Sequence, residues 1–343
     1  MPAFKIGNYN VGNEFAPFCI AEIGINHEGD FAKAERMLRD AAASGAHCVK
    51  FQTHVIEDEM IPNDVIPGNA SESIWDIMSR CVLSEDEESR LKELADELGV
   101  LFLSTPFSRA AADRLEKLGV EAYKIGSGEC NNYPLVAHIA SFGKPVILST
   151  GMNSIETVAP SVEILESAGV PYALLHCTSM YPTPYSKVRL NALTQLKAAF
   201  PRAVLGLSDH SMGIWTCLGA VSLGASILEK HFTSDRSWPG PDVPISILPE
   251  ELADMVAGSK AIHEALGGGK DILPEEQPTI DFAYASVVSI KDICKGDEFS
   301  SENIWVKRPG TGRFLAKDYK GLLGRKARCD IPADRQLDMD MVE

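Results

Sequence analysis

Residues 122–152 read AYKIGSGECNNYPLVAHIASFGKPVILSTGM, which is an apolar run, a helix-like stretch and a second apolar run. Eight such runs recur along the chain, separated mostly by segments with helical periodicity: FCIAEIG (18–24), CVKFQTH (48–54), VLFLSTPF (100–107), AYKIGSGE (122–129), VILSTGM (146–152), ALLHCTSMY (173–181), AVLGLSDH (203–210) and SILEKHFT (226–233). Near-continuous apolar runs are typical of parallel strands that are buried on both faces. Strand–helix alternation repeated in this way predicts an α/β fold, a closed (β/α)8 barrel of the TIM type. An open doubly wound sheet is the alternative, and it is disfavoured because no GxGxxG turn follows any run.

The pattern changes at GGGKDILPEEQPT (267–279), which is rich in glycine, proline and charge and has no periodicity. Such a composition is typical of a linker. Beyond it, short strand-like pieces are broken by turn residues, which predicts a small β-rich domain. We therefore expect a barrel over residues 1–266, a linker over 267–285 and a second domain over 286–343.

Composition narrows the classes of protein. The 343 residues are 45% hydrophobic and carry a formal charge of −16, so a large core is available and nucleic acid or anionic lipid is an unfavourable partner. No apolar run approaches the roughly 20 residues that cross a bilayer, and the N-terminus does not read as a secretory signal. The eight cysteines form no CxxC pair, which predicts reduced thiols and a cytoplasmic location.

Polar and ionisable residues end nearly every predicted strand: Glu22; Lys50 and Gln52; Ser104 and Thr105; Lys124, Ser127 and Glu129; Ser149 and Thr150; His176 and Thr178; Ser208, Asp209 and His210; Glu229, Lys230 and His231. In a barrel these strand ends converge on one face, where active sites lie. Because burying unpaired charge is costly, a purely structural barrel has no use for them. The pattern therefore predicts an enzyme.

Two histidines end neighbouring predicted strands, His210 on the seventh and His231 on the eighth. Imidazoles on adjacent strand ends can share one divalent ion. Two protein ligands leave positions open for water and substrate oxygens, which suits a Lewis acid acting on a carbonyl. This predicts a metal site for Mn2+ or Mg2+, since Zn2+ usually takes more protein ligands.

Lys50 and Lys124 are the candidate anion binders. A buried lysine needs a counter-charge, and a phosphate or carboxylate of a substrate would supply it. Ser127 lies in GSGE and Ser149 lies in STGM before a predicted helix, where glycines let backbone N–H groups approach an oxyanion. A plain turn is the alternative interpretation of each serine.

Carboxylates and turn residues complete the candidate site. Glu22 and Glu129 are candidates for binding sugar hydroxyls and moving protons, or else for neutralising the two lysines. Asp242 lies in the rigid turn WPGPD (238–242), and Asn69 lies in the long excursion that follows the second strand. Long loops at this face commonly shape substrate pockets.

The chain resembles the bacterial N-acetylneuraminate (sialic acid) synthases, whose relatives make legionaminic and pseudaminic acids. The resemblance is carried, in the same order, by AEIGINHEG, VKFQTH, STPFS, YKIGSGE, ILSTGM, HCTSMYPTP, GLSDHS, LEKHFT, PGPD and WVKRPGTG. The tail resembles the antifreeze-like (SAF) domain that ends these enzymes. The resemblance implies a domain-swapped homodimer in which one subunit's small domain caps the barrel mouth of the other.

The resemblance also assigns roles by motif. It implies that His210 and His231 hold a metal ion, Mn2+ with Mg2+ or Co2+ as alternatives. Phosphoenolpyruvate would contact Lys50, Thr105, Lys124, Ser127, Ser149, Ser179 and Ser208. The sugar would contact Gln52, Asn69, Glu129, Tyr181, Asp242 and Arg308, with Glu22 near its hydroxyls. Ser179 departs from members that carry Asn there, although a serine can still donate one hydrogen bond.

The activity implied is a transferase reaction that joins phosphoenolpyruvate, N-acetylmannosamine and water to give N-acetylneuraminate and phosphate, with Glu22, Glu129, His210 and His231 as catalytic groups. A diacetamido-dideoxy hexose in place of N-acetylmannosamine would give legionaminic or pseudaminic acid. A second class is a pyruvate aldolase with a Schiff base on Lys50 or Lys124. A third is a non-catalytic carbohydrate- or ice-binding protein, which the charged barrel mouth argues against.

Overall fold

The computed structural model describes residues 2–343, which form two compact units that divide between Gly267 and Gly268. The first unit contains an eight-stranded parallel sheet in the order β5-β4-β3-β10-β9-β8-β7-β6. Its strands are β3 (Phe18–Gly24), β4 (Cys48–Thr53), β5 (Leu101–Pro106), β6 (Tyr123–Ile125), β7 (Val146–Ser149), β8 (Tyr172–Cys177), β9 (Val204–Asp209) and β10 (Ile227–His231). Since β5 and β6 also contact each other, the sheet is a nearly closed barrel. The predicted fold class is confirmed.

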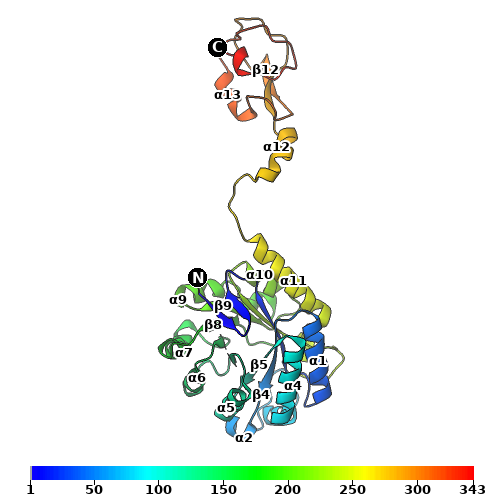
Figure 1. The fold of residues 1–343 in the computed structure, drawn as a ribbon, viewed down its shortest axis with the longest axis vertical. Coiled ribbons are helices and arrows are strands. Elements are labelled where there is room, and N and C mark those ends of the chain that lie inside the picture. Colours follow the sequence, from blue (N-terminus) through cyan, green and yellow to red (C-terminus); the bar gives the residue numbers. More distant parts are fainter. Residues whose placement is uncertain (1) are drawn as a thin grey trace. The chain divides into compact units, whose positions relative to one another are not determined.

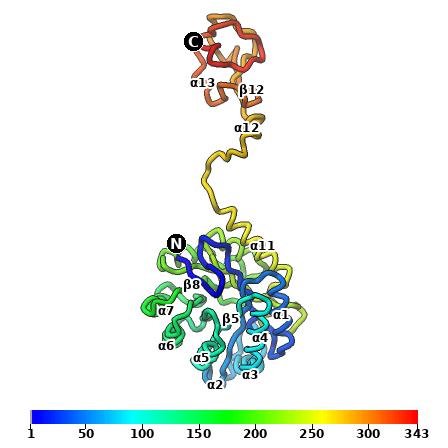
Figure 2. Tube along the Cα trace, in the orientation of Figure 1, coloured from blue at the N-terminus to red at the C-terminus, as the bar shows by residue number. Residues whose placement is uncertain are grey.

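Helices surround the strands, as Figures 1 and 2 show from blue through yellow along the sequence. They are α1 (Phe31–Ala43), α2 (Ile56–Glu59), α3 (Ile74–Cys81), α4 (Glu85–Leu98), α5 (Arg109–Leu118), α6 (Tyr133–Ala140), α7 (Ile155–Ser167), α8 (Tyr185–Val188), α9 (Ala192–Ala199), α10 (Trp215–Val221), the 3-10 turn η1 (Val243–Ile245) and α11 (Pro249–Ala265). The capping box of α4 is formed, with Glu87 N–H donating to Ser84 Oγ and Ser84 N–H donating to the Glu87 carboxylate. No helix within residues 2–343 is long and apolar enough to cross a membrane.

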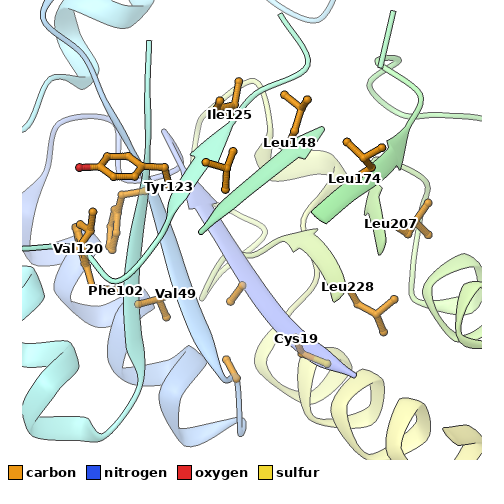
Figure 3. Close-up of a cluster of buried hydrophobic side chains, with 14 of the residues drawn as sticks. Cys19, Val49, Phe102, Val120, Tyr123, Ile125, Leu148, Leu174, Leu207 and Leu228 are labelled. Carbon is orange, nitrogen blue, oxygen red and sulfur yellow. The ribbon is translucent and has the colours of Figure 1, made fainter. Parts of the chain in front are cut away.

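Side chains alternate along each strand between two environments. Val49, Tyr123, Leu207 and Leu228 belong to the core between strands and helices (Figure 3). Since successive side chains of a strand point to opposite faces, the next residue of each strand faces the barrel interior. At the carboxyl ends of the strands these interior residues are polar. The alternation along each strand therefore places polar side chains together inside the barrel mouth.

An N-terminal hairpin closes the other end of the barrel. It consists of β1 (Ala3–Ile6) and β2 (Tyr9–Gly12), joined by a two-residue turn in which Gly7 has a φ of +54°. Ile6 and Val11 are fully buried in one cluster with inward-facing apolar residues of the barrel strands. The hairpin was not expected from the sequence.

The second unit contains the 3-10 turn η2 (Pro274–Glu276), α12 (Gln277–Ala283), β11 (Ser286–Ser289), β12 (Ile304–Lys307), η3 (Ala316–Asp318), α13 (Tyr319–Leu322) and η4 (Met339–Met341). Strands β11 and β12 pair antiparallel, and isolated bridges connect further segments. Val287, Phe299 and Ile331 are among the residues of its separate core. The stretch expected to be a linker without periodicity, 267–285, holds one 3-10 turn and one short helix.

Candidate active site

A cavity of about 150 Å3 lies at the carboxyl ends of the barrel strands. Most of the predicted site residues of the barrel line it: Glu22, Lys50, Gln52, Thr105, Lys124, Ser127, Ser149, Ser179, Tyr181, Ser208, His210 and His231. They come from every strand of the barrel or from the loop that follows it. The strand ends therefore converge on one cavity, as the positional rule for barrels predicts.

Two lysines and two glutamates form a buried network in this cavity. Lys50 Nζ lies 2.6 Å from Glu22 Oε2 and 3.9 Å from Glu229 Oε2, and it donates to Thr105 Oγ1 at 3.0 Å. Lys124 Nζ lies 3.6 Å from Glu229 Oε1. Two positive and two negative charges are thus balanced before any ligand enters, which offsets the cost of burying them.

The same contacts shift the pKa of each group. Burial, together with the nearby Glu229 carboxylate, raises the pKa of Glu22 against the opposing effect of Lys50. Burial opposes ionisation of Glu229 as well, but Lys124 and Lys50 together lower its pKa. Burial lowers the pKa of Lys124. Glu22 is therefore the more readily protonated of the two carboxylates, and Glu229 the fixed counter-ion of the lysines.

Two serine hydroxyls, those of Ser127 and Ser179, approach Gly151 in the loop after β7. Gly151 N–H donates to Ser127 Oγ at 3.0 Å. A Cβ at Gly151 would lie 2.4 Å from Ser179 Oγ and 2.8 Å from Ser127 Oγ, so any larger residue would displace these hydroxyls. The hydroxyls of Ser149 and Ser179 are buried without a hydrogen-bond partner within residues 2–343. Unpartnered buried hydroxyls are costly, so they favour a polar ligand here.

The two predicted metal ligands lie side by side, with ring centroids of His210 and His231 5.3 Å apart. His210 Nδ1 donates to the Thr178 carbonyl at 3.0 Å, which leaves the lone pair on Nε2. His231 Nδ1 is buried with no hydrogen-bond partner among the described residues and lies 4.0 Å from Asp242 Oδ2. Burial, then the nearby His210, lowers the pKa of His231 well below its usual range, so its ring is neutral.

These donors fit a divalent ion with an incomplete protein ligand set. Neutral imidazoles are the form that binds metals. Within residues 2–343 no group of three or more His, Cys, Asp and Glu side chains has metal-binding geometry, so the protein offers a pair of nitrogens. The remaining positions would be left to water and substrate oxygens, as Lewis-acid chemistry requires.

Four predicted residues do not line the cavity. Glu129 is half-buried and accepts a hydrogen bond from Asn132, because β6 ends at Ile125 and the glycine-rich loop carries the chain away before Glu129. Asn69 donates to Asp242 Oδ1 at 3.4 Å, which connects two loops beyond the cavity. Arg308 belongs to the second unit.

The cavity also contains residues to which the sequence assigned no role, namely Phe107, Met152, Cys177 and the strand-end residue Glu229. Ser208 Oγ donates to Glu229 Oε1 at 2.9 Å, so Glu229 connects the serine with both lysines. Its place could have been found from strand parity. His231 and Glu229 are two positions apart on one strand and therefore face the same side.

Two known families cover most of the chain. Residues 37–271 match the NeuB family, and residues 284–343 match the SAF domain. The chain is 40% identical over 336 residues to an uncharacterized protein of Methanocaldococcus jannaschii, which spans 97% of each chain. It is 38% identical over 325 residues to the N,N'-diacetyllegionaminic acid synthase of Campylobacter jejuni, which spans 92% of this chain and 97% of that one.

A solved structure gives the same result. The N-acetylneuraminic acid (sialic acid) synthetase of Leptospira borgpetersenii, in complex with citrate, superposes with a TM-score of 0.75 at 35% identity, over 81% of this chain and 95% of that one. The predicted family resemblance is confirmed. Fold, matched domains and relatives agree, and the chain belongs to the NeuB family of sialic-acid-type synthases.

Proposed function

We propose that this protein condenses phosphoenolpyruvate with N-acetylmannosamine and water to give N-acetylneuraminate and phosphate. The observation that carries the proposal is the pair of buried lysines beside two neighbouring histidines in one cavity. Lysines of this kind suit a small molecule with two anionic groups, and the histidines suit a carbonyl that must be polarised.

Phosphoenolpyruvate would occupy the part of the cavity around Lys50 and Lys124. Its carboxylate would replace glutamate oxygens of the buried network as a partner of Lys50, next to the hydroxyls of Thr105 and Ser208. Its phosphate would lie by Lys124, where the hydroxyls of Ser149 and Ser179 need partners. Lys124 and the serines then face the phosphate as it leaves, so they stabilise the charge that develops in the transition state.

The amino sugar would occupy the side that carries the histidines. Gln52, Tyr181 and Glu22 line the cavity there and are our candidates for its hydroxyls, with Asn69 and Asp242 in the adjoining loops. His210 and His231 would hold a divalent ion, for which Mn2+ is our first choice. When bound, that ion supplies Lewis acidity to the open-chain aldehyde of the sugar.

C3 of phosphoenolpyruvate attacks the sugar aldehyde carbon, which forms one C–C bond and leaves C2 electron-deficient. The aldehyde oxygen takes up a proton and becomes a hydroxyl group. Water adds to C2 and loses a proton, the C2–O bond to phosphate breaks, and the remaining C2 hydroxyl loses its proton to become the ketone. Glu22, whose pKa burial raises, can accept and return a proton inside the cavity. Burial also raises the pKa of Glu129, which lies outside the lining and suits proton transfer during opening of the sugar ring.

Phosphate release with a panel of sugars tests the proposal. We expect turnover with unphosphorylated N-acetylmannosamine, loss of activity in EDTA and recovery with Mn2+. One observation favours a second sugar, since the relative from Campylobacter jejuni is named a diacetyllegionaminic acid synthase. Turnover of a 2,4-diacetamido-6-deoxy hexose without turnover of N-acetylmannosamine would replace our choice by that sugar.

The panel also separates other chemistry. Borohydride trapping of pyruvate on Lys50 or Lys124, with activity unaffected by EDTA, would support an aldolase instead. Sugar binding by calorimetry without any turnover would support a carbohydrate-binding protein. Further parts of the proposal are a cytoplasmic location, for which the free cysteines argue, and a domain-swapped homodimer in which Arg308 contacts the sugar of the other subunit.

A further inference from the structure

An ion pair outside the cavity connects the two strands that carry the histidines. Lys230 Nζ lies 2.6 Å from Asp209 Oδ2, and their side chains are 0% and 2% exposed. Neither residue lines the cavity. Asp209 precedes His210 at the end of β9, and Lys230 precedes His231 at the end of β10.

The pair also forms hydrogen bonds with Ser211, the residue that follows His210 in the sequence. Ser211 N–H and Ser211 Oγ both donate to the Asp209 carboxylate, at 3.2 and 2.8 Å, and Lys230 Nζ donates to the Ser211 carbonyl. Thr216 Oγ1, on α10, donates to Asp209 Oδ2 at 2.7 Å. His210 therefore lies between two residues that are both bonded to Lys230.

The place of this pair in the sheet is informative. Lys230 and Asp209 are register partners at the last step of the β9–β10 ladder, so His210 lies beyond the backbone hydrogen bonds between these strands. Two residues earlier on the same outer face, the register partners are Leu228 and Leu207, which are simply apolar. Apolar side chains would serve stability at the last step as well, because a buried ion pair seldom adds stability over a packed apolar pair. The ion pair instead adds an oriented contact between the ends of β9 and β10.

We propose that the Asp209–Lys230 ion pair positions His210 against His231, so that their ring nitrogens can hold one divalent ion. Asp209 and Lys230 act through the histidines and touch neither substrate, so they are positioning residues. This inference rests on the metal site in the proposed function, and it adds two residues to which no role had been given.

The test compares Mn2+ affinity with stability in a double variant, Asp209→Asn with Lys230→Met. Asparagine keeps one of the two oxygens that accept from Ser211 and Thr216, and methionine keeps about the length of the lysine stem, so the change removes the charges and the Nζ hydrogen bonds but little volume. We expect Mn2+ to bind about tenfold more weakly, the usual effect of removing groups that orient metal ligands. Free Mn2+ is measured by its electron paramagnetic resonance signal during titration, and stability by thermal unfolding.

Glu116→Gln is the matched control. It removes the charge that pairs with Lys144 at 2.7 Å and weakens the hydrogen bond that Tyr123 donates, at the opposite end of the barrel. We expect this variant to lose stability while it binds Mn2+ as the wild type does. A purely structural role for Asp209 and Lys230 would give the double variant the same behaviour, and that result would overturn the inference.

Two further variants remove ambiguity. If His231→Ala binds Mn2+ as tightly as the wild type does, the metal site of the proposed function is wrong, and the inference is overturned with it. If binding depends on His231 but not on the ion pair, only the inference is overturned. Should the double variant not fold, Thr216→Val decides, because it removes one hydrogen bond to Asp209. We then expect Mn2+ to bind about threefold more weakly, a smaller effect than in the double variant because the ion pair remains, and unchanged affinity overturns the inference.

Discussion

Replacing Gly151 with alanine should specifically weaken binding of phosphoenolpyruvate. The added methyl group would lie 2.4 Å from Ser179 Oγ, 2.8 Å from Ser127 Oγ and 3.1 Å from Cys177 Sγ. Carbon and oxygen atoms that are not bonded stay more than 3 Å apart, so the Ser179 hydroxyl must turn or shift away. The backbone itself is not the obstacle, since Gly151 does not have the left-handed φ that excludes alanine.

The magnitude follows from what the hydroxyls would do. A hydrogen bond to a charged group contributes about 1.5–3 kcal/mol, so displacing the Ser179 hydroxyl should raise the KM for phosphoenolpyruvate by about 10- to 150-fold. Crowding a packed site by one methyl group typically costs about 1–3 kcal/mol of stability, so we expect a folded enzyme with a lower Tm. The KM for the sugar should change much less.

Steady-state phosphate release, with each substrate varied in turn, measures both effects. Ser179→Ala supplies the second corner of a double-mutant cycle, because it removes the atom closest to the new methyl group. Gly151→Ala should then cost less in the Ser179→Ala background than in the wild type. Equal costs in the two backgrounds, or an unchanged KM for phosphoenolpyruvate, would show that the serines around Gly151 do not hold the phosphate.

Three other predictions concern separate features. His231→Ala should lower Mn2+-dependent turnover by at least about a hundredfold while circular dichroism stays that of the wild type, since a metal ligand is lost but not the fold; wild-type rates would refute the metal assignment. Burial lowers the pKa of His27 to about 4 from its ordinary 6.5, so the unfolded chain binds the proton more tightly and acid favours unfolding. The free energy of unfolding should fall by up to about 3 kcal/mol between pH 6.5 and pH 4 on account of His27, and urea titrations should show a smaller fall in His27→Gln; identical pH dependence would contradict this. Arg308→Ala should raise the KM for the sugar, and mixing it with an inactive His231→Ala subunit should restore some activity if sites are shared between chains, whereas mixed dimers without activity would argue against sharing.

Most of the fold could be predicted from the sequence, because buried parallel strands are continuous apolar runs. Seven of the eight barrel strands lie within the predicted runs, and β8 begins one residue before its run. Several strands end sooner than predicted, since the runs included the polar residues that follow each strand. The N-terminal hairpin was missed. Its strands are only four residues each, and their burial depends on contacts with residues that are distant in sequence.

The candidate site could be predicted wherever strand parity decided it. Lys50, Lys124 and His231 are examples, because each lies at a strand end and faces inward. Parity gives no information beyond the last strand residue, which is why it could not show that Glu129 lies outside the cavity. Glu229 lies within β10, so parity does place it in the cavity, two residues before His231. Pairing of Asp209 with Lys230 could not be foreseen either, because it requires the register between two strands.

The N-terminal hairpin has a kinetic consequence. Apolar side chains fill the barrel interior below the cavity, and the hairpin closes that end with fully buried Ile6 and Val11. Molecules therefore enter and leave the cavity from the opposite side only. The lysines lie at its depth, 2% exposed, whereas Tyr181 stands near the entrance, 39% exposed. Under the proposed function, phosphoenolpyruvate has to arrive before the sugar, because a bound sugar stands in its way. Inorganic phosphate, which forms at the deep end of the cavity, would be the last product to leave. It would therefore inhibit the enzyme competitively against phosphoenolpyruvate.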